Sequence, residues 1–505
     1  MEVTSMILVI VLISVIHVTP VRCFGIFTNQ GNLEKLYLME EEIMSLTDAF
    51  LRQEFFKHEG EDPHNFTHIV KFSDRCKQIR RESQGIFVYL KHPINVFHLV
   101  RRMHEQWPNA LERILGSEPC QKWKVKELNM RLENIRHNIP TEKDVFVTAA
   151  SLVVIRQTTG TPMEEFTKGK INGHDSLEPL TLSDMVLLGR GAYDEGYYEP
   201  ARDMLAHVQR VCSEHKSSRD ASDAACVSKK NFALIAQAYG KMGQFEKAVE
   251  ALDELLKIDP QYTLAKMNRK YFLSRMKKSD TTTVKKHINW RVKYTTTCSG
   301  ERKKTALQNS QLRCRYFPTI HEFVFVKAEW LHNRPPVVVF HDLIPNHNVR
   351  ALKNSGWAKT QYIAHDDLYA TPNFAAVIHG TRSANLFNDT INRLKGPIVP
   401  PLIAGDVEVR NYGMQGLYFK SIPLKKLFKK DVASYFLELP SEFEGGEYVL
   451  PKYKVKTQLQ PGSVLFLFAS KSIVNICPVT YGTKWAALQS LAVVKTKFCR
   501  IHENW

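Results

Sequence analysis

The sequence predicts an α+β multidomain protein, with an all-α N-terminal half followed by a C-terminal β domain. Apolar residues recur at helical spacing through roughly the first half of the chain, and one helical unit is repeated there. From Asp406 to Val493, short strand-like runs are instead separated by glycine and proline turns. Many short strands with such turns are typical of a sandwich or jelly roll. The length of 505 residues allows two to four domains.

The N-terminus and the charge bear on the compartment. The apolar run from Met6 to Val18, followed by Pro20, is too short to span a bilayer and predicts a secretory signal peptide over residues 1–23. It departs from the usual pattern in carrying Glu2 where a basic residue is expected. The net charge of +17 favours acidic partners, but a secreted or lumenal chain does not meet nucleic acid. We therefore expect no nucleic acid partner and no membrane span.

Cleavage after Cys23 leaves eight cysteines, and an even number in an oxidising compartment predicts disulfides. Sequence alone permits many pairings, and sequential pairing is the simplest. It would join Cys76 to Cys120, Cys212 to Cys226, Cys298 to Cys314 and Cys477 to Cys499. Asn65 and Asn388 begin glycosylation sequons, which predicts a lumenal or secreted surface at both positions.

The region 24–165 is predicted to be a helical domain. Its first helix runs from Asn32 to Lys57, with an apolar seam made by Leu36, Met39, Ile43, Leu46 and Phe50. The seam predicts either packing inside its own domain or a coiled-coil contact in a dimer. Further helices are expected after His92-Pro93, where proline suits the first turn, and from about Glu142 to Gln157.

The region 166–275 contains a repeated helical hairpin. Small and apolar residues of the second copy occupy tetratricopeptide positions: Ala236, Tyr239, Gly243, Ala248, Leu252, Leu255 and Pro260. The first copy has the same pattern 47 residues earlier, with the surplus over a 34-residue period falling in the loop between Cys212 and Cys226. Beyond it, the lysine-rich segment 276–315 is expected to be a solvated linker, although it could also meet an anionic glycan or an acidic protein.

The turns of the β region carry the most specific motifs. They are Asn411-Tyr412-Gly413, Gly445-Gly446-Glu447-Tyr448-Val449-Leu450-Pro451, Pro461-Gly462-Ser463, Cys477-Pro478-Val479 and Gly482-Thr483-Lys484-Trp485. In this order they resemble the catalytic domain of the collagen prolyl 4-hydroxylase alpha-subunit family, and the resemblance covers nearly the whole mature chain. It implies a double-stranded β-helix over 316–505 and 4-hydroxylation of peptidyl proline in procollagen, with iron(II), 2-oxoglutarate and ascorbate.

The iron ligands that this family implies are replaced. Such dioxygenases hold iron with two histidines and a carboxylate, and the resemblance places these ligands on Ser421, Pro423 and Val474. No histidine lies between His379 and His502. We therefore predict a divergent member that has lost iron and is catalytically inactive. Lys484 matches the lysine that binds the far carboxylate of 2-oxoglutarate, and it is either a retained anchor or a structural lysine.

The resemblance also implies partners. It makes the tetratricopeptide module a binding site for proline-rich or collagen-like peptides, with Tyr193, Tyr197, Tyr198 and Tyr239 as groove residues, although tyrosines packed between helices are the simpler alternative. It further implies pairing with protein disulfide isomerase, self-association through the N-terminal helix, and residence in the endoplasmic reticulum lumen, or secretion without retention. Cys298 with Cys314 and Cys477 with Cys499 also match positions paired in the family.

Three hypotheses remain open on the sequence. The chain is a catalytically silent relative that binds or regulates, a working prolyl 4-hydroxylase whose iron is held in another way, or a secreted tetratricopeptide-bearing protein with no link to hydroxylation.

Overall fold

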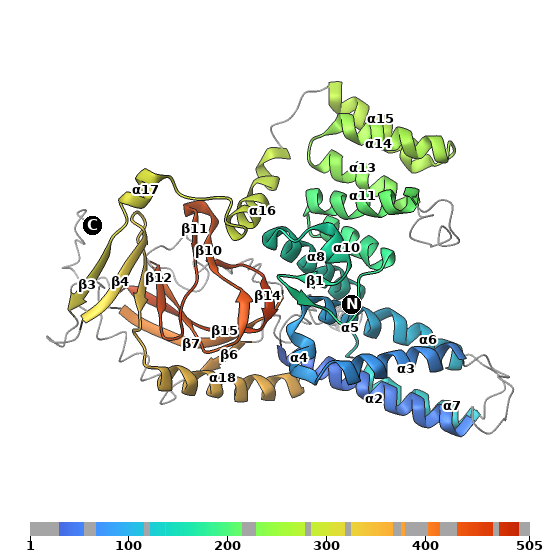
Figure 1. The fold of residues 1–505 in the computed structure, drawn as a ribbon, viewed down its shortest axis with the longest axis horizontal. Coiled ribbons are helices and arrows are strands. Elements are labelled where there is room, and N and C mark those ends of the chain that lie inside the picture. Colours follow the sequence, from blue (N-terminus) through green and yellow to red (C-terminus); the bar gives the residue numbers. More distant parts are fainter. Residues whose placement is uncertain are drawn as a thin grey trace, which may run out of the picture.

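The computed structural model describes residues 30–54, 67–115, 122–136, 138–214, 229–277, 284–318, 325–366, 375–378, 402–414, 432–467 and 474–493. In Figure 1 the helical half lies to the right and the β domain to the left. Within these ranges, the chain has no helix whose length and hydropathy would let it cross a bilayer.

The N-terminal helices form one body. They are α2 (Gln30–Glu54), α3 (Thr67–Glu82), α4 (Ile86–Lys91), α5 (Pro93–Arg101), α6 (Trp107–Leu115), α7 (Lys122–Arg136), α8 (Glu142–Thr159) and α9 (Met163–Thr167), with a π-helical turn (Arg102–Gln106) joining α5 to α6. A short hairpin follows, made of β1 (Lys170–Ile171) and β2 (His174–Asp175). Capping explains the predicted starts of α5 and α8, because the His92 ring accepts the Ile94 N–H and Thr141 forms a capping box with Asp144.

The apolar seam of α2 packs inside its own domain. Leu36, Met39, Ile43 and Phe50 are all buried in the large helical core. Packing within the domain, one of the two predicted uses of this seam, is therefore the one realised in the chain, and a dimer contact would need another face of α2.

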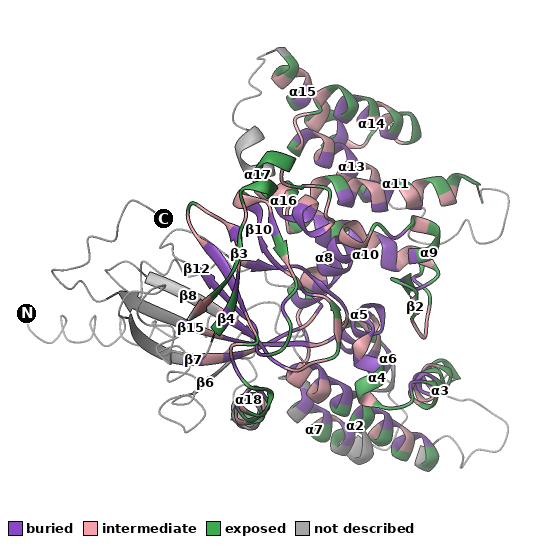
Figure 2. Cartoon of the chain, turned by 60° about the vertical axis from the view of Figure 1, so that its left-hand side comes forward, coloured by how far each residue is buried: buried purple, intermediate pink, exposed green. Residues whose placement is uncertain are grey.

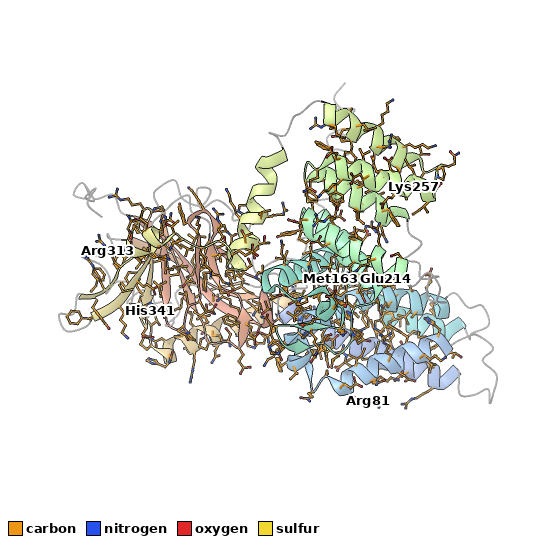
Figure 3. The ribbon with its side chains drawn as sticks, turned by 45° about the horizontal axis from the view of Figure 1, so that its top comes forward. Arg81, Met163, Glu214, Lys257, Arg313 and His341 are labelled. Carbon is orange, nitrogen blue, oxygen red and sulfur yellow. A yellow bond between two sulfur atoms is a disulfide. The ribbon has the colours of Figure 1, made fainter. Side chains whose placement is uncertain are left out.

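The tetratricopeptide region is a stack of helices that extends upward in Figure 1. It consists of α10 (Leu182–Asp194), α11 (Tyr198–Glu214), α13 (Lys229–Lys241), α14 (Phe245–Ile258) and α15 (Thr263–Lys277). Small residues permit the close packing, as predicted: a Cβ on Gly189 would lie 2.7 Å from the Leu205 side chain. Figure 3 shows the side chains of both units, with Glu214 at the end of α11 and Lys257 near the end of α14.

The β domain contains strands at the predicted places and others before them. Its strands are β3 (Cys314–Pro318), β4 (Phe325–His332), β5 (Val337–His341), β6 (Ala375–Ile378), β7 (Leu402–Tyr412), β8 (Val432–Glu438), β9 (Phe443–Gly445), β10 (Tyr448–Leu450), β11 (Val455–Thr457), β12 (Val464–Leu467), β13 (Asn475–Ile476), β14 (Val479–Gly482) and β15 (Lys484–Val493). The large sheet has the order β3-β4-β5-β12-β8-β15-β7-β6, and smaller sheets have the orders β11-β10-β13 and β14-β9. All these pairings are antiparallel, and the non-consecutive neighbours give the predicted jelly roll.

The large sheet is covered on both faces, as Figure 2 shows by the buried residues along its central strands. On one face Val464, Phe466 and Trp485 pack with residues of α18 (Asn346–Asp366). On the other face Leu465, Leu467 and Ala486 meet the small sheet of β10, β11 and β13. This second face is the interior of the jelly roll.

The predicted solvated linker is wrong for its central part. It contains the helix α16 (Val284–Cys298), in which Tyr294 is buried and donates its hydroxyl to the Ile476 carbonyl at 2.8 Å. Lys456 also donates to the Cys298 carbonyl, at the last residue of α16. The segment therefore docks α16 against the edge of the jelly roll, because its aromatic residues gain burial there.

The predicted sequential disulfides also need correction. Cys298 is bonded to Cys477, across 179 residues, and Cys314 is free and exposed on β3. Cys76 is free and buried in the helical core, so its predicted bond to Cys120 is absent. The docking of α16 brings Cys298 to β13 and away from β3, which explains the change. Cys212 is disulfide-bonded; Cys120, Cys226 and Cys499 lie outside the described residues, as do Asn65 and Asn388.

Candidate functional site

Lys484 lies inside the jelly roll, at the first residue of β15. Its side chain is fully buried, and its ammonium donates to the Glu438 carboxylate, which is buried as well. The Nζ atom also lies 4.2 Å from the centre of the Tyr448 ring and 4.6 Å from that of Phe443. Both rings face a cation closely enough for favourable cation–π contact.

Strand geometry brings the two charges together. Ala486 on β15 stands opposite Glu438 on β8, and Lys484 shares the face of Ala486 because strand side chains alternate with a period of two. Lys484 and Glu438 are thus diagonal cross-strand neighbours on the interior face. The turn before β10 passes directly over the lysine stem, where a Cβ on Gly446, with φ of 65°, would lie 3.0 Å from the lysine Cδ.

Burial opposes charge on both partners. Burial lowers the pKa of Lys484 and raises the pKa of Glu438, and their mutual attraction offsets only part of each shift. Burial, with the nearby Glu438 carboxyl as the next cause, raises the pKa of Tyr448 well above its usual range. The Tyr448 hydroxyl lies near enough to the Glu438 carboxyl to interact with it, although among the described residues neither this hydroxyl nor Oε1 of Glu438 has a hydrogen-bond partner of standard geometry. The interior therefore holds one ammonium, one carboxylate and spare hydrogen-bonding capacity.

Of the three implied iron-ligand positions, one lies within the described residues. Ser421 and Pro423 lie outside the described residues. Val474 is half-buried and packs against the apolar cluster between the sheets. Its side chain has no atom that can bind a metal, so this position does not fit the implied iron. The described part of the chain contains no group of three histidine, cysteine or acidic residues arranged to hold a metal ion.

The four predicted groove tyrosines are all partly buried, and three of them fall into two settings. Tyr193 and Tyr198 meet edge to face at 5.3 Å, and the Tyr193 hydroxyl donates to Gln237 of the next unit at 3.3 Å. Tyr197 instead faces Arg291 of α16, whose guanidinium lies 5.3 Å from its ring centre. The structure thus brings Tyr193, Tyr198 and Gln237 together and places Tyr197 against the docked helix.

Tyr239 belongs to a third setting. It packs into the core of the second unit, and the Arg202 guanidinium lies 5.6 Å from its ring centre. Tyr239 is therefore not part of the Tyr193 and Tyr198 pair.

The helical half covers the rim of the jelly roll close to Lys484. The Gln30 N–H donates to Oδ1 of Asn411 at 2.8 Å, and its side-chain oxygen accepts from the Thr483 hydroxyl at 3.1 Å. Farther along the rim, the His174 ring stacks on Tyr481 and meets Glu444 at 2.8 Å. Contacts between the two halves of the chain therefore cover this part of the rim beside Lys484.

The sequence did not point to Glu438, and it gave Tyr448 only as part of a turn motif, without a role beside Lys484. Glu438 is the only acidic residue of the run Val432 to Leu439, which was a visible sign of a special position. Only the pairing of β8 with β15 shows that it faces Lys484.

Comparison with known proteins finds two family-model matches, relatives in sequence and neighbours in structure. Residues 30–173 match the family model described as prolyl 4-hydroxylase alpha-subunit, N-terminal region, and residues 230–262 match a tetratricopeptide repeat. The chain is 22% identical over 520 residues to prolyl 4-hydroxylase subunit alpha-1 of Bos taurus, covering 92% of both chains. It is 24% identical over 519 residues to the alpha-1 subunit of Gallus gallus, covering 91% of this chain and 95% of that one. The viral collagen prolyl hydroxylase of Paramecium Bursaria Chlorella virus-1 is a structural neighbour with a TM-score of 0.24 and 16% identity, covering 31% of this chain and 90% of that one.

Proposed function

Because the chain belongs to the family of prolyl 4-hydroxylase alpha subunits, we propose that it binds proline-rich or collagen-like peptides in the secretory pathway without oxidising them. The family reaction is 2-oxoglutarate-dependent 4-hydroxylation of peptidyl proline. In this proposal the chain keeps the peptide-binding part of that task as a binding or regulatory subunit.

The environment of Val474 supports the loss of oxidation. A two-histidine, one-carboxylate site needs all its ligands on one face, with open positions for the other reactants. Here an aliphatic side chain stands at the implied distal histidine and packs into an apolar cluster. The resemblance puts serine and proline at the other two positions. Without a metal, oxygen chemistry of this type has no centre.

The pairing of Tyr193 with Tyr198 is the observation that carries the peptide-binding part. Two partly exposed aromatic rings beside an amide group of the neighbouring unit match the needs of an extended proline-rich ligand. Such a ligand is already ordered, so its binding costs little conformational entropy, and its rings pack on aromatic faces. Burial, reinforced by the neighbouring Tyr198 and Asp194, raises the pKa of Tyr193 to about 12, so the Tyr193 hydroxyl remains a donor at neutral pH.

The remaining partner and location assignments follow the same proposal. We place the chain in the endoplasmic reticulum lumen after removal of the signal peptide, with sugars on Asn65 and Asn388 and with protein disulfide isomerase as partner. Self-association would use a surface of the N-terminal domain other than the buried seam of α2, for example that around Leu38, which is 56% exposed.

The test uses the full chain co-expressed with protein disulfide isomerase. We expect a proline-rich, collagen-like peptide to bind in isothermal titration calorimetry. Tyr193→Ala and Tyr198→Ala should each weaken binding about fivefold to tenfold, in line with the loss of an aromatic contact worth roughly 1 kcal/mol. Tyr316→Ala is the matched control, because Tyr316 is an exposed tyrosine on β3 of the jelly roll. Binding unaffected by the first two changes would refute the groove.

The second arm of the same test concerns chemistry. Anaerobic titration with iron(II) and assay of succinate formation from 2-oxoglutarate should give neither stoichiometric iron nor peptide-dependent turnover. Turnover at stoichiometric iron would overturn the proposed inactivity and would mean that iron is held by other residues. Absence of both peptide binding and turnover would favour a binding protein with no link to hydroxylation.

A further inference from the structure

Glu438 occupies the position in which a carboxylate from solution would meet Lys484. Its carboxylate accepts directly from the lysine ammonium, and both side chains are at most 1% exposed. The resemblance assigns a carboxylate ligand to this same lysine, but here the protein supplies one from its own strand β8. We propose that Glu438 is a built-in ligand that keeps the interior of the jelly roll closed to 2-oxoglutarate and other small carboxylates, and that its removal opens a carboxylate-binding site at Lys484.

Electrostatics make a second carboxylate unfavourable. A dicarboxylate entering this interior would bring its charge beside that of Glu438, and like charges in a buried site repel strongly. Among the described residues, the ammonium of Lys484 is the one that pairs with Glu438. Any exogenous carboxylate at Lys484 would therefore leave Glu438 buried without a counter-charge, which is costly.

The surroundings of the pair fit a binding site better than a purely structural ion pair. Glu438 uses one oxygen for Lys484, and the Tyr448 hydroxyl interacts with the same carboxyl group, although among the described residues this hydroxyl and the other oxygen lack partners of standard geometry. An ammonium, a phenol hydroxyl and two aromatic faces together form a receptor for a single carboxylate group. Gly446 leaves room for the lysine stem.

The rim contacts explain how the receptor stays closed. Gln30 joins Asn411 to Thr483, the residue directly before Lys484. With these rim contacts in place and with Glu438 supplying the carboxylate, Lys484 has no room for a carboxylate from solution. The Lys484 site lies in the jelly roll alone, so its closure by Glu438 does not depend on peptide binding by the tetratricopeptide groove.

The test compares the full-length wild-type chain with Glu438→Ala, using sodium acetate, succinate and 2-oxoglutarate as probes against sodium chloride at equal ionic strength. We expect Glu438→Ala to melt at a lower temperature. Acetate at about ten times its Kd should raise that temperature saturably by roughly 3 °C. The wild-type chain should respond to none of the three carboxylates. The double variant Glu438→Ala/Lys484→Met is the matched control, and it should be insensitive to acetate because the ammonium is gone.

Two results would overturn the inference. Saturable binding of 2-oxoglutarate or succinate by the wild-type chain would show that Glu438 does not block the site. A folded Glu438→Ala chain that ignores all three carboxylates would show that no site was opened. Should Glu438→Ala fold poorly, refolding in acetate against chloride provides the readout: recovery in acetate by the single variant, but not by the double variant, supports the site, and equal yields in both salts refute it. Peptide titration of the same proteins distinguishes failure here from failure of the proposed function.

Discussion

Glu40 in the helical half and Glu438 in the jelly roll are both buried carboxylates, but they have different hydrogen-bond donors around them. Glu40 accepts from Nε of Arg102 at 2.7 Å, from Nη2 of Arg80 at 2.5 Å and from the Trp107 indole at 3.1 Å. Glu438 accepts from Lys484, and the Tyr448 hydroxyl is the other donor near its carboxyl group among the described residues. The carboxylate of Glu40 has two guanidiniums and an indole around it, whereas that of Glu438 has one ammonium and a nearby phenol.

The pKa values respond accordingly. Burial by itself raises the pKa of Glu40, but the charges of Arg102 and Arg80 and the bonds to its carboxylate outweigh burial and lower it. For Glu438 burial prevails and the pKa is raised. A buried carboxylate with several charged donors is therefore held in its charged form by the fold, whereas burial opposes the charged form of Glu438 more than its surroundings favour it.

Among the substitutions compared, Glu40→Gln should cause the largest loss of unfolding free energy. It removes the carboxylate that pairs with both Arg80 and Arg102 and leaves Arg102 with Glu178 at 3.6 Å, and breaking such a buried cluster typically costs about 3–5 kcal/mol. The free energy of unfolding in urea at pH 7 measures it. Glu42→Gln on the exposed face of α2 is the matched control and should change stability by less than about 0.5 kcal/mol. A loss for Glu40→Gln as small as that of the control would contradict the comparison.

The disulfide that braces the jelly roll comes next. Cys477 directly follows β13, which pairs with the Tyr448 strand β10, so the bond to Cys298 supports the sheet on one side of the Glu438 pair. Cys298→Ser should cost about 2–5 kcal/mol of unfolding free energy, because the bond closes a long loop. Cys314→Ser is the control, since Cys314 is free. Equal losses for Cys298→Ser and Cys314→Ser would restore the sequential pairing.

These two regions also show what the sequence could and could not predict. Local turn chemistry was readable: Gly445, Gly446, Gly462 and Gly482 all take positive φ at the predicted breaks between strands. The pairings that depend on distant segments were not. Cys298 meets Cys477 only after α16 docks, and Glu438 meets Lys484 only through the register of β8 on β15. Alternation along β8 gives two possible faces, and nothing local decides between them.

A third buried group lies where the two halves meet. Burial, only partly opposed by the bond to the His174 carbonyl, lowers the pKa of His92 to about 4. Its Nδ1 accepts from Ile94 and its Nε2 lies 3.3 Å from that carbonyl, which suits the neutral ring. The unfolded chain, with a pKa near 6.5, binds more protons between these values, so stability is full above pH 6.5 and falls as pH drops toward 4.

This pH effect has a direct measurement. Between pH 7 and pH 4 the wild-type chain should lose about 3 kcal/mol more unfolding free energy than His92→Asn, whose amide can still cap α5 without titrating. Unfolding in urea across this pH range measures the difference. Parallel curves for the two proteins would mean that folding leaves the pKa of His92 at its unfolded value.

The smallest effect is expected where both charges of the jelly roll are replaced together. Lys484→Met/Glu438→Leu removes an ion pair with one donor and fills the interior with side chains of similar size, so the double change should alter the free energy of unfolding by about 1 kcal/mol or less, or even increase it. Lys484→Met alone leaves the Glu438 carboxylate buried without a counter-charge, so it should lower the free energy of unfolding by more than the double change does. Urea unfolding of the three variants gives the coupling energy between the two positions. If the double variant lost as much unfolding free energy as Glu40→Gln, the ion pair would stabilise the jelly roll as strongly as the Glu40 cluster stabilises the helical half. The contrast between a structural cluster and a self-occupied site would then have to be abandoned.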